Sequence, residues 1–309
     1  MRAFVFPGQG SQFVGMGADL AGSFPICRRT FEEAEGVLGI ALRRVCFEGP
    51  ESELQMTAIA QPAILTTSVA ALRALGEEGI EPDVVAGHSL GEYTALVAAG
   101  SLEFADAVVL VRKRGSYMQE AVPVGRGAMA AVLGLDRDLM EEVCREATTA
   151  GEMVSPANFN APGQIVISGH AGAVARAIGL SRDRGARRAL ELPVSAPFHC
   201  PLMEPAARRL AGDLQATRFA DLRVPLVANV HARAVQTGEE ARQRLREQVT
   251  APVLWEDCVR TLVSMGATSA LEVGPGRVLT GLMKRMEPGI RCEPVGDPAG
   301  IAAAKESRS

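Results

Sequence analysis

The sequence lacks an excess of positive charge, and this limits the partners that the protein can have. Its 309 residues include 32 Lys and Arg against 36 Asp and Glu, so the formal net charge is −4. No positive field over the whole protein is available to hold nucleic acid or anionic lipid. We therefore expect no nucleic-acid partner, and polyanion binding would need a local basic patch.

Paired cysteines and long apolar runs are also lacking. The six cysteines lie far apart, and no C-x-x-C pair or His-x-His cluster has the spacing of a structural zinc site. Free buried thiols in a reducing cytosol are the simplest interpretation. The turn at Pro7 comes too early for a signal peptide, and no uncharged apolar run of about 18 residues follows. These features predict a cytoplasmic protein without membrane association.

The composition that is present is that of a folded, soluble chain. Hydrophobic residues make up 47% and charged residues 22%, which excludes intrinsic disorder and a coiled coil. The length predicts one large domain or two, with a sizeable buried core.

Short β-rich runs alternate with longer helical patterns in the first part of the chain, and such alternation predicts an α/β fold with a parallel sheet. The expected strands are 3–6 and 83–86, and the expected helices are 58–75 and 92–99. After residue 195 the expected elements are helices 202–216 and 239–249, strands 226–230 and 269–273, and a helix ending at 286. The alanine-rich tail after Pro298 is expected to be weakly ordered.

The pattern changes between Pro123 and Pro193, which punctuate the ends of a compact segment. Strands at 128–133, 164–168 and 189–192, with helices after Asp136 or Asp138 and at 171–184, give a β-α-β-α-β order. We expect an inserted subdomain at 124–194, so that the main body consists of 1–123 and 195–309.

The best candidate for a nucleophile lies in Gly87-His-Ser-Leu-Gly91, directly between an expected strand and an expected helix. This is the context that the G-x-S-x-G elbow requires. Gly87 and Gly91 remove side chains where the chain must turn sharply, so Ser89 can sit exposed at the positive helix N-terminus. The alternative is that Ser89 only caps the helix.

A serine hydroxyl needs a base to take its proton, and the chain has four histidines. His199 lies in a proline-flanked loop before an expected helix, where a rigid scaffold presents functional side chains. We choose it as the base. His88 is too close in sequence to turn back onto Ser89, whereas His170 and His231 stay open as alternatives.

Together the motifs resemble one family, the malonyl-CoA:acyl carrier protein transacylases of fatty acid synthesis and the related acyltransferase domains of polyketide synthases. The resemblance covers nearly the whole chain. The motifs stand in order as Phe6-Pro-Gly-Gln-Gly-Ser-Gln12, Gly87-His-Ser-Leu-Gly91, Arg114-Gly-Ser-Tyr-Met118, Asn158-Phe-Asn-Ala-Pro-Gly163, Ser195-Ala-Pro-Phe-His199 and Glu272-Val-Gly-Pro-Gly276. Six matches in register are more specific than one elbow. The fold that the resemblance implies is a hydrolase-like α/β core with a largely parallel sheet and an inserted ferredoxin-like α+β subdomain.

The resemblance implies that Ser89 is acylated and that His199 is its base and acid, oriented by a backbone carbonyl in place of an Asp. The carbonyl expected for this is that of Leu254. The family often has Gln in a Pro-Val-Gln-Trp run, whereas this chain has Pro252-Val-Leu-Trp255, a change that a main-chain role survives. The backbone N–H groups of Gln9 and Leu90 would form the oxyanion hole.

For the substrate, the resemblance makes Arg114 the clamp for the free carboxylate of malonyl, since a guanidinium can hold a carboxylate by two parallel hydrogen bonds. A solvated helix arginine is the ordinary alternative. Phe198 would leave little room for an α-methyl branch, giving a partial preference for malonyl. Asn158 and Asn160 would line the site or only form turns.

The implied reaction is two acyl transfers through a malonyl-serine, from malonyl-CoA to the phosphopantetheine thiol of acyl carrier protein, without a metal or redox cofactor. The acidic carrier protein would dock on a basic patch. The candidates are Lys284 and Arg285, or the cluster Arg182, Arg184, Arg187 and Arg188. Nothing in the sequence demands more than a monomer.

Three other functions remain to be compared with this one. A serine esterase or thioesterase shares G-x-S-x-G, but it has no use for Arg114 unless its acid carries a carboxylate. A non-enzymatic subunit that binds acyl carrier is disfavoured because the residues that the chemistry needs are all present. An acyltransferase that serves a polyketide synthase in trans would use the same residues.

Overall fold

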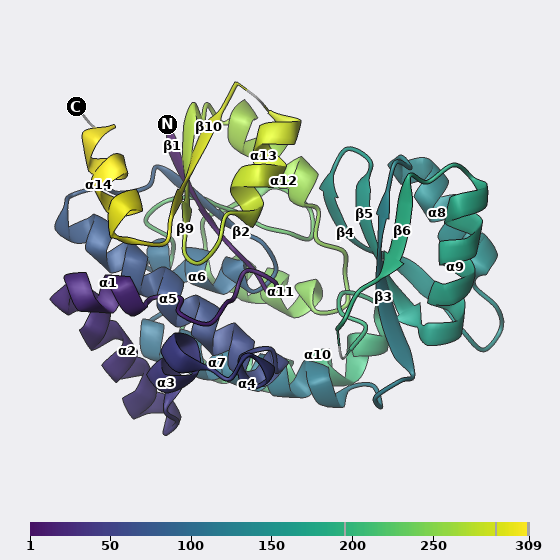
Figure 1. Ribbon diagram of the computed structural model, residues 1–309, viewed down its shortest axis with the longest axis horizontal. Coiled ribbons are helices and arrows are strands. Elements are labelled where there is room, and N and C mark those ends of the chain that lie inside the picture. Colours follow the sequence, from purple (N-terminus) through teal and green to yellow (C-terminus); the bar gives the residue numbers. More distant parts are fainter. Residues whose placement is uncertain (195, 288, 308–309) are drawn as a thin grey trace.

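The protein consists of two lobes, described here from a computed structural model over residues 1–194, 196–287 and 289–307. Figure 1 shows the larger lobe with a mostly parallel sheet among helices and the smaller lobe with an antiparallel sheet. This is the α/β architecture with an inserted ferredoxin-like α+β subdomain that the family resemblance implies.

The larger lobe is built on a six-stranded sheet with the order β10-β9-β1-β2-β7-β8. All neighbouring strands run parallel except β7 and β8. Residues 3–6 of β1 are completely buried, as expected for a central parallel strand covered on both faces. The strands are β1 (Arg2–Phe6), β2 (Val84–Gly87), β7 (Leu226–Val227), β8 (Ala234–Val235), β9 (Ser269–Val273) and β10 (Arg291–Val295).

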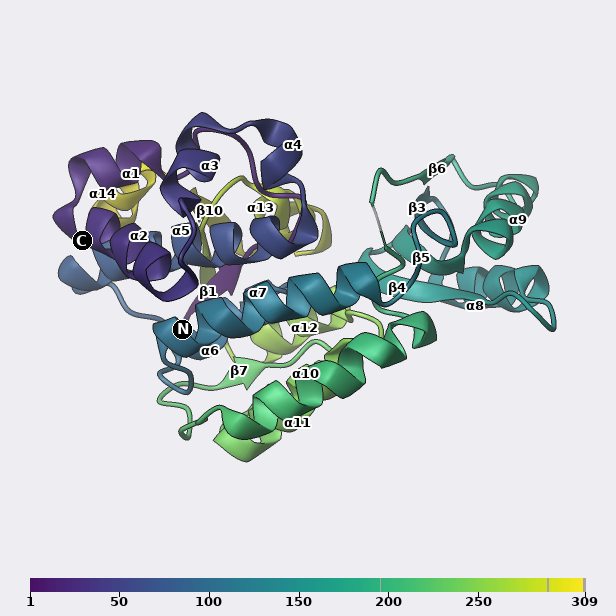
Figure 2. The same ribbon diagram turned by 90° about the horizontal axis from the view of Figure 1, so that it is seen from below.

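Helices surround this sheet, and α7, α10 and α11 lie side by side along one side of the lobe (Figure 2). The helices of the lobe are α1 (Ala18–Ser23), α2 (Pro25–Leu38), α3 (Leu42–Glu48), α4 (Glu51–Leu54), α5 (Thr57–Glu77), α6 (Gly91–Ala98), α7 (Phe104–Glu120), α10 (Glu204–Ala216), α11 (Gly238–Gln248), α12 (Trp255–Ser264), α13 (Val278–Met286) and α14 (Pro298–Glu306), with a 3-10 turn at Pro201–Met203.

Helix α5 is long and apolar enough to cross a membrane by length and composition, a feature that the sequence analysis did not single out. Its most apolar window is 83% buried inside the protein, where it packs against α2 and α7. The helix therefore has the surroundings of a core helix in a soluble protein.

The smaller lobe contains β3 (Gly127–Leu133), α8 (Arg137–Ala147), β4 (Val154–Ala161), β5 (Gln164–His170), α9 (Ala171–Asp183) and β6 (Arg188–Glu191). Its antiparallel sheet has the order β4-β5-β3-β6, with α8 and α9 packed on it. The strand β4 was not predicted, because Pro156 and two asparagines interrupt its apolar pattern. Adding β4 turns the predicted β-α-β-α-β order into β-α-β-β-α-β, the ferredoxin-like arrangement. The expected boundary residue Ser195 lies outside the described residues.

Two other predictions about elements were wrong. The tail after Pro298 is not weakly ordered but forms α14, capped by Asp297, whose Oδ1 accepts a hydrogen bond from the Gly300 amide at 2.7 Å. Ile301 and Ala304 bury the inner face of this helix in the core. The strand expected at 226–230 is shorter than predicted, because the chain leaves the sheet before Asn229.

Candidate active site

The chain turns sharply between β2 and α6, and Ser89 lies at the turn. Its φ is +52°, a conformation that non-glycine residues rarely adopt. A Cβ on Gly87 would lie 1.9 Å from the carbonyl carbon of Gly91, and one on Gly91 would lie 2.1 Å from the carbonyl oxygen of Phe6. Only glycine fits at these two positions, so the motif makes the elbow that the sequence predicts.

The structure brings Ser89 and His199 together. Nε2 of His199 lies 2.7 Å from Oγ of Ser89, within hydrogen-bond distance. His199 is 4% exposed, lies in the loop before the 3-10 turn and also has a positive φ, +57°. Strain at both residues is typical of groups that the surrounding fold holds in place for function.

The other three histidines have different partners. Nε2 of His88 lies 2.8 Å from Oδ1 of Asn160, in the smaller lobe, and its ring meets that of Trp255 edge to face. Nδ1 of His170 accepts from the Met153 amide, and Nδ1 of His231 accepts from the Arg233 amide. His199 is therefore the histidine that the structure places on the serine.

The carbonyl that orients His199 is that of Gln248, so the prediction of Leu254 was wrong. Nδ1 of His199 lies 2.9 Å from the main-chain oxygen of Gln248. Gln248 ends α11, where helix carbonyls lack an intrahelical donor and are free for other partners. The Leu254 carbonyl instead accepts from the Cys258 amide in the first turn of α12.

Burial and the nearby Arg114 charge lower the pKa of His199 to about 3. Taking the imidazolium out of water is costly, and a positive neighbour adds to that cost. The imidazole is therefore neutral at physiological pH. With Nδ1–H donating to Gln248, Nε2 is free to accept the proton of Ser89.

Arg114 is a buried residue of α7, 1% exposed, and not a solvated helix arginine. Its Nη1 donates to Oε1 of Gln61 at 2.8 Å, and its Nη2 donates to Oε1 of Gln248 at 3.0 Å. The same Nη2 donates to Oγ of Ser89 at 3.1 Å. The guanidinium thus lies beside the nucleophile, held by two amide oxygens.

The loop that carries Gln9 passes close to the elbow. A Cβ on Gly8 would lie 2.4 Å from the carbonyl oxygen of His88, so a glycine is needed for this approach. The Gln9 side chain is tied to Oγ1 of Thr57 at 3.3 Å. In the described part of the chain, the amides of Gln9 and Leu90 have no hydrogen-bond acceptor. Both border the same cavity as Ser89.

A cavity of about 730 Å³ lies over Ser89 and collects most of the predicted site residues. Its lining combines the larger lobe with β4 and β5 of the smaller one and with the connection at 192–194. The predicted residues in its lining are Ser89, His199, Gln9, Leu90, Arg114, Phe198, Asn158 and Asn160. Leu254 is absent from this lining. Asn158 and Asn160 belong to β4 and do not form turns.

Sequence reasoning missed three buried polar residues behind the elbow, namely Glu92, Asn229 and Gln248. Oδ1 of Asn229 accepts from the Ser89 amide at 2.8 Å, and its Nδ2 donates to the Gly87 carbonyl at 2.7 Å. These bonds hold the strained turn from behind. Only Glu92 carried a local signal, because it directly follows the elbow motif.

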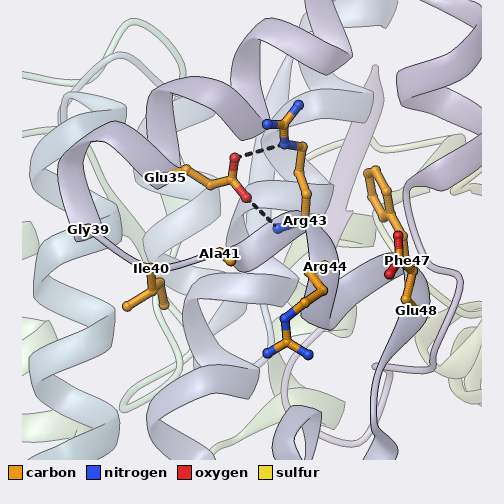
Figure 3. Close-up of a pocket in the computed structure, with 8 residues that line it drawn as sticks. All are labelled: Glu35, Gly39, Ile40, Ala41, Arg43, Arg44, Phe47 and Glu48. Carbon is orange, nitrogen blue, oxygen red and sulfur yellow. Dashed lines mark hydrogen bonds and ion pairs between the residues drawn. The ribbon is translucent and has the colours of Figure 1, made fainter.

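A second cavity, of about 530 Å³, lies between α2 and α3 (Figure 3). Glu35 lines this cavity, and its carboxylate accepts two hydrogen bonds from Arg43. The Arg43 backbone amide donates one at 2.9 Å, and the Arg43 side-chain Nε donates the other at 2.7 Å. The eight residues drawn around it include no serine, cysteine or histidine. This cavity therefore offers no nucleophile.

Comparison with known proteins agrees with the geometry around Ser89. The model of the acyl transferase domain family matches residues 3–293. The chain is 50% identical to the malonyl CoA-acyl carrier protein transacylase of Escherichia coli strain K12, covering 98% of both proteins. It is 48% identical to the transacylase of the same name from Bacillus subtilis strain 168, covering 98% of this chain and 95% of that one.

Solved structures of similar proteins superpose closely on this one. The malonyl CoA-acyl carrier protein transacylase of Coxiella burnetii has a TM-score of 0.96 at 43% identity, covering 99% of this chain and 96% of the other. A malonyl-transacylase solved in complex with a type II PKS acyl-carrier protein has a TM-score of 0.96 at 47% identity, covering 99% of both chains.

Proposed function

The chain belongs to the acyl transferase domain family, and on this basis we propose that it transfers malonyl from malonyl-CoA to the phosphopantetheine thiol of acyl carrier protein for fatty acid synthesis. The observation that carries the proposal is that a base and a guanidinium both contact the hydroxyl oxygen of Ser89. Oγ of Ser89 lies 2.7 Å from Nε2 of His199 and 3.1 Å from Nη2 of Arg114.

In the first half of the reaction, Oγ of Ser89 attacks the thioester carbonyl of malonyl-CoA while its proton passes to Nε2 of His199. The carbon–sulfur bond then breaks, and His199 returns the proton to the leaving sulfur of CoA. The product is a malonyl ester on Ser89. The Gln248 carbonyl accepts from Nδ1 throughout and so fixes the ring and its tautomer.

In the second half, the carrier thiol gives its proton to His199 and attacks the ester carbonyl. The bond between that carbon and Oγ breaks, and the proton returns to Ser89. In both halves negative charge develops on the carbonyl oxygen, and the amides of Gln9 and Leu90 would receive it. Neither half changes an oxidation state, so the reaction needs no redox cofactor. Because His199 moves the protons and the two amides would receive the oxyanion charge, we propose that no metal takes part either.

Arg114 selects the acyl group in this proposal. One methylene separates the carboxylate of malonyl from its thioester carbonyl, so a clamp for that carboxylate must lie close to the nucleophile. Arg114 meets this requirement by its contact with Ser89 Oγ. Burial strengthens the pairing, because water competes poorly for the guanidinium there. Phe198, with 8% of its surface exposed, narrows the cavity against an α-methyl branch.

The carrier protein is proposed to dock on Lys284 and Arg285 of α13. Both side chains are exposed, and Val278, Leu279 and Leu282 of the same helix line the cavity. Nη1 of Arg285 donates to Oε1 of Gln164, another lining residue.

The alternative docking patch consists of Arg182, Arg184, Arg187 and Arg188. Two of these residues already have partners within the protein. Arg184 pairs with Glu142 and Glu146, and Arg182 donates to the Ala189 carbonyl. The partner of Arg285 is a neutral amide, which leaves its positive charge uncompensated among the described residues, whereas the partners of Arg184 are carboxylates. We therefore favour the α13 pair.

A second candidate is supply of malonyl to a polyketide carrier protein, favoured by the similarity to the transacylase bound to a type II PKS carrier. The residues and the reaction would be the same, so the carrier alone distinguishes the two. We further propose that the protein works in the cytoplasm as a monomer. Sedimentation at a mass well above 32.5 kDa would contradict the monomer.

The decisive experiment supplies malonyl-CoA labelled in the malonyl group. Label should stay on Ser89 until a holo carrier protein is added, and then move to the carrier. Release of free malonate instead would indicate a thioesterase, and unimpaired transfer by Ser89→Ala would indicate that the site is not catalytic. Pairing malonyl-, methylmalonyl- and acetyl-CoA with fatty acid and polyketide carriers identifies the physiological partner.

A further inference from the structure

Glu92 is a buried carboxylate to which the proposed mechanism gives no role. It lies in the first turn of α6 and is 0% exposed. Its Oε2 accepts hydrogen bonds from the Asn229 amide and from Nε2 of Gln248, both at 3.0 Å. Its Oε1 has no hydrogen-bond partner among the described residues. Burial raises the pKa of Glu92 to about 7. Burying a carboxylate lowers the stability of the fold, so we expect a compensating role for Glu92. The residues that contact Glu92 show which groups that role can involve.

Gln248 is the neighbour that connects Glu92 to the reacting groups. Its Nε2 donates to Glu92 and, at 3.0 Å, to the main-chain oxygen of Ser89. Its Oε1 accepts from Nη2 of Arg114 at 3.0 Å, and its own main-chain oxygen accepts from His199. One residue therefore contacts the nucleophile, the base and the carboxylate clamp.

The Gln248 amide is useful to Arg114 in only one of its two orientations. Arginine can only donate, so the amide oxygen must face it, and the amide nitrogen must then face acceptors. Rotating the amide by half a turn would set two donors against each other at Arg114, and it would set the amide oxygen against two acceptors, Oε2 of Glu92 and the Ser89 carbonyl. Among the side chains that contact the amide, Glu92 supplies the acceptor at Oε2 whether or not Oε1 carries a proton.

Asn229 also contacts the amide, but it does not decide this orientation. Its Oδ1 lies 3.3 Å from Nε2 of Gln248, a longer contact than the one to Glu92. That oxygen already accepts from the Ser89 amide at 2.8 Å. The shorter contact and the stronger, carboxylate acceptor both belong to Glu92.

We propose that Glu92 is a positioning residue that turns the amide oxygen of Gln248 toward Arg114 and thereby holds the guanidinium in place for a carboxylated acyl group. This inference rests on the proposed malonyl transfer. A merely structural carboxylate would stabilise the protein without affecting which acyl group is chosen.

The test measures the ratio of malonyl to acetyl transfer onto Ser89, which does not depend on the fraction of folded enzyme. Glu92→Leu removes the acceptor, so this ratio should fall at least tenfold. Glu92→Gln keeps one oxygen, which can accept both hydrogen bonds that Oε2 accepts now, and should recover most of the ratio. Equal losses of both transfers in Glu92→Leu, or no recovery in Glu92→Gln, would overturn the proposal.

Glu272→Leu is the matched control, because Glu272 is also 0% exposed and accepts two backbone N–H bonds, from Leu279 and Thr280. It does not contact Gln248 in the described structure. The control should lower the melting temperature and leave the ratio of malonyl to acetyl transfer at the wild-type value. A fall in the ratio as large as that of Glu92→Leu would mean that any lost buried carboxylate has this effect, against the proposal.

Gln248→Met completes a double-mutant cycle, since it removes the amide and keeps the main-chain oxygen that contacts His199. It should lower the ratio as Glu92→Leu does, and the two changes together should cost no more than either alone. Additive losses would show that Glu92 does not act through Gln248. Should Glu92→Leu fail to fold, an unchanged ratio in Gln248→Met overturns the proposal by itself. Failure of the proposed function is distinct, because the wild-type protein would then transfer no malonyl.

Discussion

Ser89 and His199 meet at 2.7 Å although 110 positions separate them in the chain, and both hold a left-handed backbone conformation. The elbow presents the serine and a buried loop presents the histidine. Neither group reaches the other by local structure alone, so the pair depends on the complete larger lobe.

His199→Ala should slow acylation of Ser89 by about 10²- to 10⁴-fold, because the serine loses the group that takes its proton. The KM for malonyl-CoA should change little, since Arg114 and the cavity remain. Single-turnover mixing with labelled malonyl-CoA measures both quantities. His170→Ala, which removes a histidine bonded to the Met153 amide, is the control and should acylate at the normal rate. Comparable losses in both variants would contradict the assignment of the base.

Arg114→Ala should reduce malonyl transfer at least tenfold more than acetyl transfer, because a charge-assisted contact to the carboxylate is worth roughly 1.5–3 kcal/mol. Competition between the two CoA esters gives the ratio directly. Lys113→Ala changes the residue of α7 that precedes Arg114, an exposed side chain paired with Asp213, and should leave the ratio unchanged. Equal losses with both esters in Arg114→Ala would remove the clamp from the mechanism.

Acylation should stay level between pH 8 and pH 5. The active form of His199 is the neutral imidazole, which exists above its pKa, and burial and Arg114 lower that pKa to about 3. Burial also lowers the pKa of the nearby His88, which disfavours its charged form. Glu92, whose pKa is raised to about 7, titrates in this range, but its free Oε1 can take the proton without breaking either hydrogen bond at Oε2. A fall in kcat/KM centred near pH 6.5 would show that His199 is exposed to water in the working enzyme.

Stability should respond to acid through the same histidine. The unfolded chain binds a proton at His199 near pH 6.5, whereas the folded protein does so only near pH 3. The stability contributed by the neutral imidazole is therefore present above pH 6.5 and is lost as the pH falls toward 3. Melting temperatures of wild type and of His199→Gln should converge or cross as the pH is lowered, and a constant difference would contradict this linkage.

Phe198→Ala should raise the use of methylmalonyl-CoA relative to malonyl-CoA by about tenfold, since a methyl group in an apolar pocket is worth about 1–3 kcal/mol. The measurement is the ratio of kcat/KM for the two esters. An unchanged ratio would mean that another wall of the cavity excludes the branch.

Replacing Lys284 and Arg285 together with Glu should raise the KM for acyl carrier protein at least tenfold and leave acylation by malonyl-CoA unaffected. Charge reversal repels an acidic partner, and added salt should reduce the difference between variant and wild type. Arg187→Glu with Arg188→Glu is the comparison, because these residues belong to the alternative patch. A larger effect from that second pair would move the docking surface to the smaller lobe.

The sequence predicted the reacting residues of the site better than the buried residues that hold them in position. Ser89, His199 and Arg114 stand in short motifs, and the elbow motif implies its own geometry through glycines at fixed spacing. Gln248 was missed because its main role uses a backbone carbonyl, which any residue type has, and because it ends a helix rich in charged residues. Asn229 was missed because it follows an apolar strand without a motif of its own.

Among the elements, the continuous apolar runs were predicted well, as at β9 and α5. The strand β4 was hidden because proline and asparagine break its alternation, and yet its asparagines line the cavity. The tail was misjudged because its alanines suggested weak packing, whereas the burial of Ile301 and the cap at Asp297 depend on tertiary contacts that no local pattern shows.

The pairing of β1 with β9 constrains the order in which parts of the protein can fold during synthesis. Arg2 lies opposite Ser269 in this sheet, so one neighbour of β1 is made long after β1 itself, whereas its other neighbour, β2, is made much earlier. The smaller lobe, by contrast, is one uninterrupted stretch from β3 to β6. It can therefore complete its own sheet before β7, β9 and β10 of the larger lobe have been made, so we expect the smaller lobe to form ahead of the full surroundings of Ser89.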